Sequence, residues 1–381
     1  MWSYEVCGPR TGRRYHDVVL ASTSWDVRMN GQVGSGTSVI ETRDPVYAAW
    51  SGSFFRQNTL PWERVLVGKW NEEPVWAHII TDRSFDFKTG RLTLQHSEIG
   101  TLLRSRFFHH SSSYSASASM TLGPYTRASL VKAMVLEMCG GGWSVPEADW
   151  SSRRMPVHVG ELAAGTVRLT TKQSEFEKPW DRMVEISESA SPIDFTFEPG
   201  FGADPSGGGP SPYAGFEWRF RFGSPMTRSE HSYTVNAPKS PILDLQVHDN
   251  AGEFATAVFA LGEGMGDDRP VRRAGSARVP ERPSVVNYGK ISDPDRLLSQ
   301  AQGELAYVQD FPDSWTMKMD AATVCAPMLG GNSDGIRPGS RINLEWNDRY
   351  WGIGSKELYV TSIKGDDSDV VSVEVQALWE G

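Results

Sequence analysis

The stretch 254–274, FATAVFALGEGMGDDRPVRRA, decides how the middle of the chain folds. Its first part, residues 255–261, is an apolar run long enough for one buried strand. Alternate glycines follow and allow backbone angles that other residues avoid: Gly262, Gly264 and Gly266. The stretch therefore predicts a strand that ends in a tight, glycine-rich turn.

Two structures can follow such a turn. In a dinucleotide-binding site the glycines lead into a helix whose N-terminus holds the pyrophosphate. Here Pro270 and a pair of arginines come next, and residues 270–279 predict a second extended segment. We therefore expect a sharp turn between two strands rather than a nucleotide site. Glu263 or Asp268 should lie close to Arg269 in that turn.

Length and composition limit the class of protein. A chain of 381 residues is too long for one ordinary core, so about two to four modules are expected. The residues are 39% hydrophobic and 22% charged, with abundant Gly, Pro and aromatic residues, which is typical of β-rich globular proteins. The formal net charge of −9 argues against a nucleic-acid-binding role for the chain as a whole.

The cysteines are few and far apart: Cys7, Cys139 and Cys325. Without a CxxC pair they predict neither a zinc site nor a disulfide framework, and we expect reduced, mostly buried thiols. Residues 1–17 lack the apolar segment of a signal peptide. No run of about 20 apolar residues occurs, so no membrane span is expected.

The N-terminal part predicts strands joined by short turns. Residues 25–30 alternate between apolar and polar side chains and run into the turn signal Asn30-Gly31. A meander of three strands follows, at residues 65–67, 76–81 and 91–96. Ser97 is typical of an N-cap and predicts a short helix that ends near Arg106.

The middle of the chain mixes helices and strands. Amphipathic helices are predicted at 126–139, ended by the glycines that follow, and at 174–189. Strands are predicted at 193–198, 217–222 and 240–247. The Gly/Pro/Ser-rich segment 199–215 predicts a loop.

A long helix and further strands are predicted toward the C-terminus. Ser292 as N-cap and Pro294 in the first turn indicate a helix to about residue 308. Strands follow at 315–319 and 341–346, and then a hairpin of 358–363 and 370–377 around Gly365-Asp366-Asp367.

The sequence gives only weak support for catalysis or metal binding. His109 and His110 invite a metal interpretation, but no further ligand stands at the right spacing, and a surface loop explains them better. Asp181 and Glu185 share one helix face, as on any solvated helix. Cys139 would need a histidine partner, and a helix C-terminus raises the pKa of a thiol. We expect no catalytic residue, no metal site and no cofactor.

The order of these elements resembles the baseplate hub, or tail-tip minor tail protein, of long-tailed actinobacterial phages. These are siphovirus relatives of the N-terminal part of tail-associated lysins. Four stretches carry the likeness: the opening strand with residues 25–36, the meander and helix of 65–106, the strand and glycine turn ATAVFALGEGMGDDRPV, and IRPGSRINLEW with LYVTSIKGDDSDVVSVEVQAL. No lysin domain is seen, unlike in longer relatives.

The resemblance implies an α+β, mainly β fold in which two β-barrel tube domains flank α/β inserts. The implied parts are a first barrel (1–105), an α/β insert (106–200), a β-rich insert (201–285) with the strand and GxGEG turn at 254–279, a connecting helix (286–312) and a second barrel (313–381).

The resemblance also implies a structural role without enzymatic activity. Three copies would form a ring that continues the tail tube at the virion tail tip, assembled in the host cytoplasm. Implied partners are the distal tail protein, the tape measure protein and other minor tail or fibre proteins, with the host cell surface as a further contact. DNA would pass through the acidic lumen without specific binding.

Two alternatives stay open at this point. A tail-associated hydrolase of cell-wall sugar or peptide would show a cleft with convergent acids. A carbohydrate-binding tip protein would expose a pair of aromatic side chains. The aromatic residues that we expect at the core or at subunit contacts are Trp25, Trp62, Trp70, Trp76 and Trp346. Gly262, Gly264, Gly266 and Arg269 are the expected structural turn.

Overall fold

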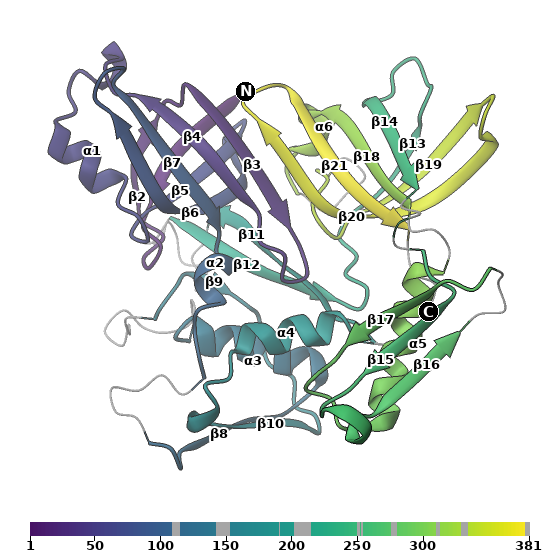
Figure 1. The fold of residues 1–381 in the computed structure, drawn as a ribbon. Helices are drawn as coiled ribbons and strands as arrows, with labels where there is room; N and C mark the ends of the chain where they lie inside the picture. Colours follow the sequence, from purple (N-terminus) through teal and green to yellow (C-terminus); the bar gives the residue numbers. More distant parts are fainter. Residues whose placement is uncertain are drawn as a thin grey trace.

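The structure is a computed structural model, and it describes residues 1–108, 115–141, 153–189, 191–201, 215–249, 252, 254–275, 280–309, 313–328 and 334–377. Strands dominate these residues, so the mainly β prediction is confirmed. One large sheet forms the upper part in Figure 1, and two smaller α/β units lie below it. His109, His110 and most of the segment 199–215 lie outside the described residues.

The large sheet has thirteen strands and is built from both ends of the chain. The N-terminal strands are β1 (Trp2–Cys7), β2 (Arg14–Val18), β3 (Ser22–Arg28), β4 (Ser35–Glu41), β5 (Val65–Trp70), β6 (Glu73–Asp86) and β7 (Arg91–Glu98). The later strands are β13 (Glu230–Thr234), β14 (Ile242–Asp249), β18 (Asp313–Asp320), β19 (Arg341–Asp348), β20 (Gly352–Asp366) and β21 (Val370–Ala377).

Strands β3 and β20 join the two halves of this sheet. β20 is 15 residues long. Its first part pairs with β19, and its last residues pair with β3, where Ser362 lies opposite Arg28. A single hydrophobic core then runs through both halves, from Trp25 and Trp76 to Ile363.

The expectation of two closed barrels needs correction. The path of the large sheet runs from β14 to β2 and has an unpaired edge at each end, so the described strands form one open sheet and close no barrel. The cause is the length of β20, which continues past the residues paired with β19 and takes β3 as a further neighbour while β21 pairs along its other edge. The domain boundaries proposed from the sequence stay a prediction.

A glycine in this sheet makes room for a tryptophan. Gly68 lies opposite Trp76, and a Cβ atom on Gly68 would come within 2.1 Å of the indole. We expect Gly68→Ala to lower the free energy of unfolding by about 1–3 kcal/mol through overpacking. Gly303 lies inside a helix, where an added Cβ atom would meet nothing within 4 Å, so Gly303→Ala should leave stability equal or slightly higher. Urea denaturation of both variants measures this, and equal stability of the two would contradict the expectation.

The second unit lies below the N-terminal half of the large sheet (Figure 1). It contains β8 (Ser119–Tyr125), α3 (Arg127–Met138), β9 (Val157–His158), β10 (Val167–Lys172), α4 (Pro179–Ser187), β11 (Asp194–Phe201) and β12 (Phe216–Gly223). The helices share a core with the lower face of the sheet, through Val65, Val67 and Ile79. The unit is thereby fixed to the sheet rather than tethered.

Both predicted helices of this unit exist. The Thr126 side chain caps α3, and Gly140 and Gly141 follow the helix with positive φ angles of 59° and 87°. The second helix is shorter than predicted. Pro179 occupies its first turn, and Phe176 before it has a left-handed backbone conformation that breaks the helix.

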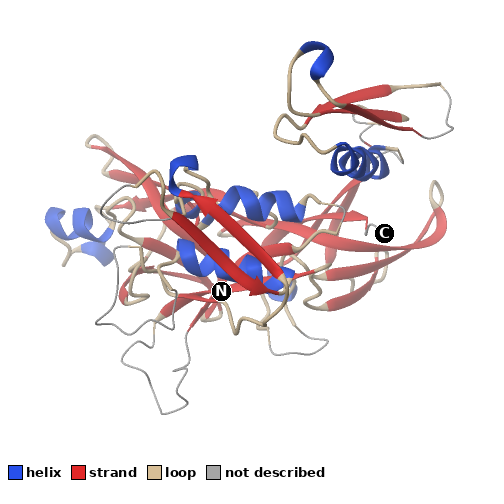
Figure 2. Ribbon diagram, turned by 90° about the horizontal axis from the view of Figure 1, so that it is seen from below, coloured by secondary structure: helices blue, strands red, loops and turns tan. Residues whose placement is uncertain are grey.

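The third unit is formed by β15 (Ala257–Leu261), β16 (Val271–Gly275), β17 (Pro283–Asn287) and α5 (Pro294–Val308). Figure 2 shows it projecting from one end of the molecule. The predicted turn between two strands is confirmed, since β15 and β16 pair antiparallel around it. No ion pair joins Arg269 to Glu263 or Asp268 among the described residues, and their expected closeness to Arg269 stays a prediction. Among the described residues its guanidinium donates to the Gly262 carbonyl at 2.9 Å and to Asn287.

Other differences are local. Asp293, rather than Ser292, caps α5. β7 continues through Ser97 to Glu98, because both residues pair with β6, so only the short α2 (Gly100–Leu103) remains of the predicted helix. The short helices α1 (Gly52–Asn58) and α6 (Ala321–Val324) were not predicted. No helix in the described part of the chain is long and apolar enough to cross a membrane.

Candidate assembly surfaces

Strand β11 connects the second unit to the large sheet. Its sequence alternates, so Phe195 and Phe197 share one face, and Asp194 and Glu198 share the other. The aromatic face packs on Trp180 of α4, with ring centroids 5.7 and 6.3 Å apart. The polar face is also buried, which requires partners for every charge on it.

Asp194 is the meeting point of three segments. Its Oδ1 accepts a hydrogen bond from the Asn30 amide at 2.7 Å, and its Oδ2 accepts from the Tyr359 hydroxyl at 3.0 Å and the Met226 backbone N–H at 3.2 Å. Burial and the nearby Asp194 carboxylate raise the pKa of Tyr359. The contacts tie β11 to the β3–β4 turn, to β20 and to the segment before β13.

Glu198 lies in a cluster of arginines. Both of its oxygens accept from Arg228 at 2.7 Å, and Oε2 also accepts from Arg221 at 3.0 Å. Burial alone would raise the pKa of Glu198, but the guanidiniums of Arg228 and Arg221 outweigh it and hold the pKa below its usual value. This ion cluster fixes the orientation of the second unit on the large sheet.

Three of the five predicted tryptophans come together. Trp25 stacks on Trp76 at 6.3 Å, and Trp2 lies edge-on to Trp25 and Trp70 at 5.5 and 5.2 Å. The indole N–H groups of Trp2 and Trp25 donate to backbone carbonyls of the β20–β21 turn. Burial of Trp25, Trp70 and Trp76 makes them core residues of the junction. Trp62 lies elsewhere and is 47% exposed.

An exposed aromatic cluster, which we call the hairpin tip, consists of Tyr350, Trp351 and Ile353 at the β19–β20 turn. Tyr350 is 89% exposed and Ile353 85% exposed, and Trp351 is half exposed. Trp346, the fifth predicted tryptophan, supports the tip from β19 through contacts with Trp315 and Trp351 at 5.7 and 6.5 Å. Sequence reasoning missed this tip, although two adjacent aromatic residues within a turn are a readable signal.

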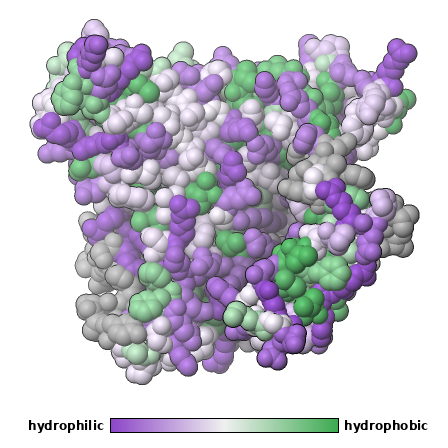
Figure 3. Space-filling view, in the orientation of Figure 1, coloured by the Kyte–Doolittle hydropathy of each residue, from purple (hydrophilic) through white to green (hydrophobic). Residues whose placement is uncertain are grey.

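A second apolar surface, the outer face of the third unit, lies on the side of the sheet away from α5. Val285 is 63% exposed and Val271 44% exposed. Phe259 lies between the two outer strands, opposite Val285 and Arg273. Figure 3 shows hydrophobic surface gathered over this unit. Exposed apolar patches of this kind mark protein contacts.

The described residues offer little for covalent or metal chemistry. They contain no group of three or more His, Cys, Asp or Glu side chains placed to hold a metal ion. All three thiols are buried, and burial raises the pKa of Cys139 and of Cys325 to about 12. At neutral pH these thiols are therefore protonated and poor nucleophiles.

Comparison with known proteins gives the fold a context. No protein-family model and no curated protein matches the sequence. Among solved structures, the tail protein from Neisseria meningitidis MC58 is 13% identical with a TM-score of 0.54, covering 99% of this chain and 98% of that chain. The 43 kDa tail protein of prophage MuSo2 from Shewanella oneidensis is 10% identical with a TM-score of 0.57, covering 98% and 97%. The chain therefore shares its fold with two tail proteins over almost its whole length.

Proposed function

We propose that the chain is a structural baseplate hub protein of a long-tailed phage. Three copies form a ring at the tail tip that continues the tail tube and joins the distal tail protein to tip or fibre proteins. The observation that carries this proposal is the fold shared with two tail proteins over nearly the full length of all three chains. A match of that extent includes both halves of the large sheet and the two smaller units.

The layout of the large sheet supports a ring. Each copy contributes two β-rich halves, joined side by side through β3 and β20 (Figure 1), so three copies place six halves around one axis. Among the described strands the sheet ends at β14, β2 and β13, whose outer edges neighbouring copies can cover. The net charge of −9 suits a channel through which DNA moves without adhering.

The exposed apolar surfaces supply the contacts. The hairpin tip and the outer face of the third unit expose apolar side chains, which contact water in a monomer. In the ring these surfaces lie against neighbouring copies or against the distal tail protein and other tip proteins. The tape measure protein contacts the inner side.

We expect the purified chain, alone or with its candidate distal tail protein, to form particles of three times the 42.2 kDa subunit mass in light scattering. Tyr350→Ser/Ile353→Ser should shift these particles toward monomers, because it removes two apolar side chains from the hairpin tip. Phe87→Ser is the matched control, since Phe87 is 84% exposed at a different hairpin. A chain that stays monomeric with and without the partner would contradict the proposal.

One observation favours a second function, carbohydrate binding at the tail tip. Tyr350 and Trp351 are exposed neighbours with ring centroids 5.8 Å apart. Their planes are 76° apart, however, so they offer no flat platform for a sugar ring. Calorimetric titration of the chain with host wall polysaccharide distinguishes the functions: saturable binding that Trp351→Ser abolishes would support this one.

A further inference from the structure

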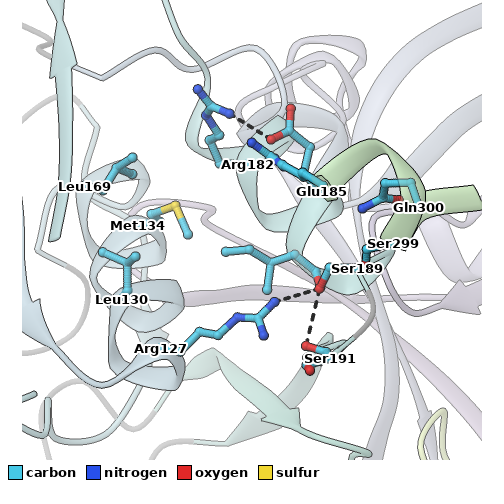
Figure 4. A pocket seen from close by; sticks show the side chains of 12 residues that line it. Arg127, Leu130, Met134, Leu169, Arg182, Glu185, Ser189, Ser191, Ser299 and Gln300 are labelled. Atoms are coloured by element: carbon cyan, nitrogen blue, oxygen red, sulfur yellow. Dashed lines mark hydrogen bonds and ion pairs between the residues drawn. The ribbon is translucent and has the colours of Figure 1, made fainter. Parts of the chain in front are cut away.

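A cavity of about 400 Å³ lies between the second and third units. Helices α3 and α4 and strand β10 form one side, and α5 forms the other (Figure 4). The size is within the usual range for ligand sites. Because all of its walls belong to a single chain, the cavity exists whether or not the ring forms, and the inference drawn from it goes beyond the proposed function.

One wall of this cavity is apolar. Leu130 and Met134 come from successive turns of α3, and Leu169 comes from the neighbouring strand β10. Figure 4 shows the three side chains on the same side of the cavity. Met134 is fully buried and Leu130 is 6% exposed, whereas Leu169 is half-buried, so an aliphatic group of a ligand would reach this wall chiefly at Leu169.

The rest of the lining is mostly polar and includes three arginines. Arg182 is neutralised by Glu185 at 2.8 Å and by Glu177. Arg127 donates to the Ser189 hydroxyl at 2.6 Å, and neither Arg127 nor Arg296 forms an ion pair with any described residue. Three guanidiniums thus face one carboxylate among the described lining residues, in a chain of net charge −9.

We propose that this cavity binds an acidic peptide segment of a partner protein. An aliphatic side chain of the peptide packs on Leu130, Met134 and Leu169, and flanking carboxylates pair with Arg127 and Arg296. Guanidinium groups bind carboxylates through two parallel hydrogen bonds, which gives direction as well as attraction. A bare phosphate would fill only part of the volume and would not cover Leu169.

Methyl NMR tests the proposal directly, because the methyl group of Met134 lines the cavity. The probes are acetyl-Glu-Leu-Asp-amide, its uncharged counterpart acetyl-Gln-Leu-Asn-amide, and inorganic phosphate. The signal is assigned with Met134→Leu. We expect the acidic peptide to shift the Met134 signal saturably, while the exposed Met1 signal stays in place and the uncharged peptide has no saturable effect.

Variants localise the binding. Arg127→Gln/Arg296→Gln should weaken binding of the acidic peptide about tenfold or more, since it removes both guanidiniums that lack a carboxylate partner among the described residues. Arg296→Gln alone keeps the Arg127–Ser189 contact and should give a smaller loss. Arg56→Gln/Arg349→Gln removes two exposed arginines elsewhere and should change nothing.

Several outcomes would overturn the proposal. Equal binding of the charged and uncharged peptides would remove the role of the arginines. A Met134 shift with phosphate but not with the peptide would make the cavity a simple anion site. No shift with any probe would show that the cavity binds no acidic segment, without bearing on whether the chain forms trimers.

Discussion

Glu198→Gln should lower the free energy of unfolding by about 3–5 kcal/mol. The amide has nearly the shape of the carboxyl group, so packing is kept and only the charge is lost. Arg228, whose side chain is 7% exposed, then remains as a buried cation without its bidentate partner. Arg337 is buried close to the same carboxylate, so its positive charge also loses the negative charge that stabilises it.

Urea denaturation followed by tryptophan fluorescence measures the effect. Glu41→Gln is the matched control, because Glu41 pairs with Arg91 at 2.9 Å on the surface, and exposed pairs contribute about 1 kcal/mol or less. Glu198→Leu/Arg228→Met removes the buried ion pair, although Arg337 stays, and it should cost less than Glu198→Gln alone. An equal fall in the free energy of unfolding for Glu198→Gln and Glu41→Gln would show that the buried cluster stabilises the fold no more than an exposed ion pair does.

Acidification should destabilise the fold through two buried histidines. The Nδ1 atoms of His78 and His96 lie 2.9 Å apart, and His96 also contacts the Ser38 hydroxyl at 2.9 Å. One of the two facing nitrogens must donate and the other accept, so a second proton has no place between them. Burial, together with His96, lowers the pKa of His78, and burial lowers the pKa of His96 to about 3.

The sign of the effect follows from these pKa values. The unfolded chain binds protons on both imidazoles below pH 6.5 and the folded protein does not, so stability is present above pH 6.5 and is lost on acidification. Each histidine contributes a slope of about 1.4 kcal/mol per pH unit. Burial raises the pKa of Glu98 to about 8, which opposes one of the two slopes between pH 4.5 and 8. The net loss from pH 6.5 to 4.5 is therefore about 3 kcal/mol, and it steepens below pH 4.5.

Denaturation at a series of pH values between 4 and 6.5 checks this expectation. His78→Asn/His96→Gln removes both titrating imidazoles and leaves Glu98, so the slope between pH 4.5 and 6.5 should reverse its sign, whatever the effect of the substitutions on stability at neutral pH. His158→Gln changes an exposed histidine and should leave the slope as it is. An unchanged slope in the double variant would assign the acid sensitivity to other groups.

Local sequence signals correctly predicted the elements whose pattern lies within a short stretch of the chain. The β20–β21 hairpin follows from alternation and the turn at Gly365, and α5 follows from its apolar stripe and Pro294. Signals of this kind act over a few residues, so they remain readable without the rest of the fold. The helix predicted after Ser97 failed because pairing of β7 with β6 outweighed the capping preference of one serine.

The tertiary arrangement was less predictable. Alternation in β11 marks Asp194 and Glu198 as one polar face, and a polar face usually meets water. Only the structure shows that Tyr359 and Arg228, distant in the sequence, enclose it. The cavity could not be predicted from the sequence either, because Arg127 and Arg296 come from different units and no spacing in the sequence relates them. The hairpin tip, in contrast, could have been found from its adjacent aromatic residues.

The pairing of β3 with β20 also sets the order in which the protein can mature. Trp25 and its carbonyl partner at Asp366 are 341 positions apart, so the ribosome must add all of the intervening residues before β3 gains its second neighbour. During synthesis one edge of β3 stays open to other chains, and contacts of such high sequence separation form slowly. Nascent chains therefore complete the sheet only after residue 366 has left the ribosome, and a co-translational holdase should raise the yield of folded protein.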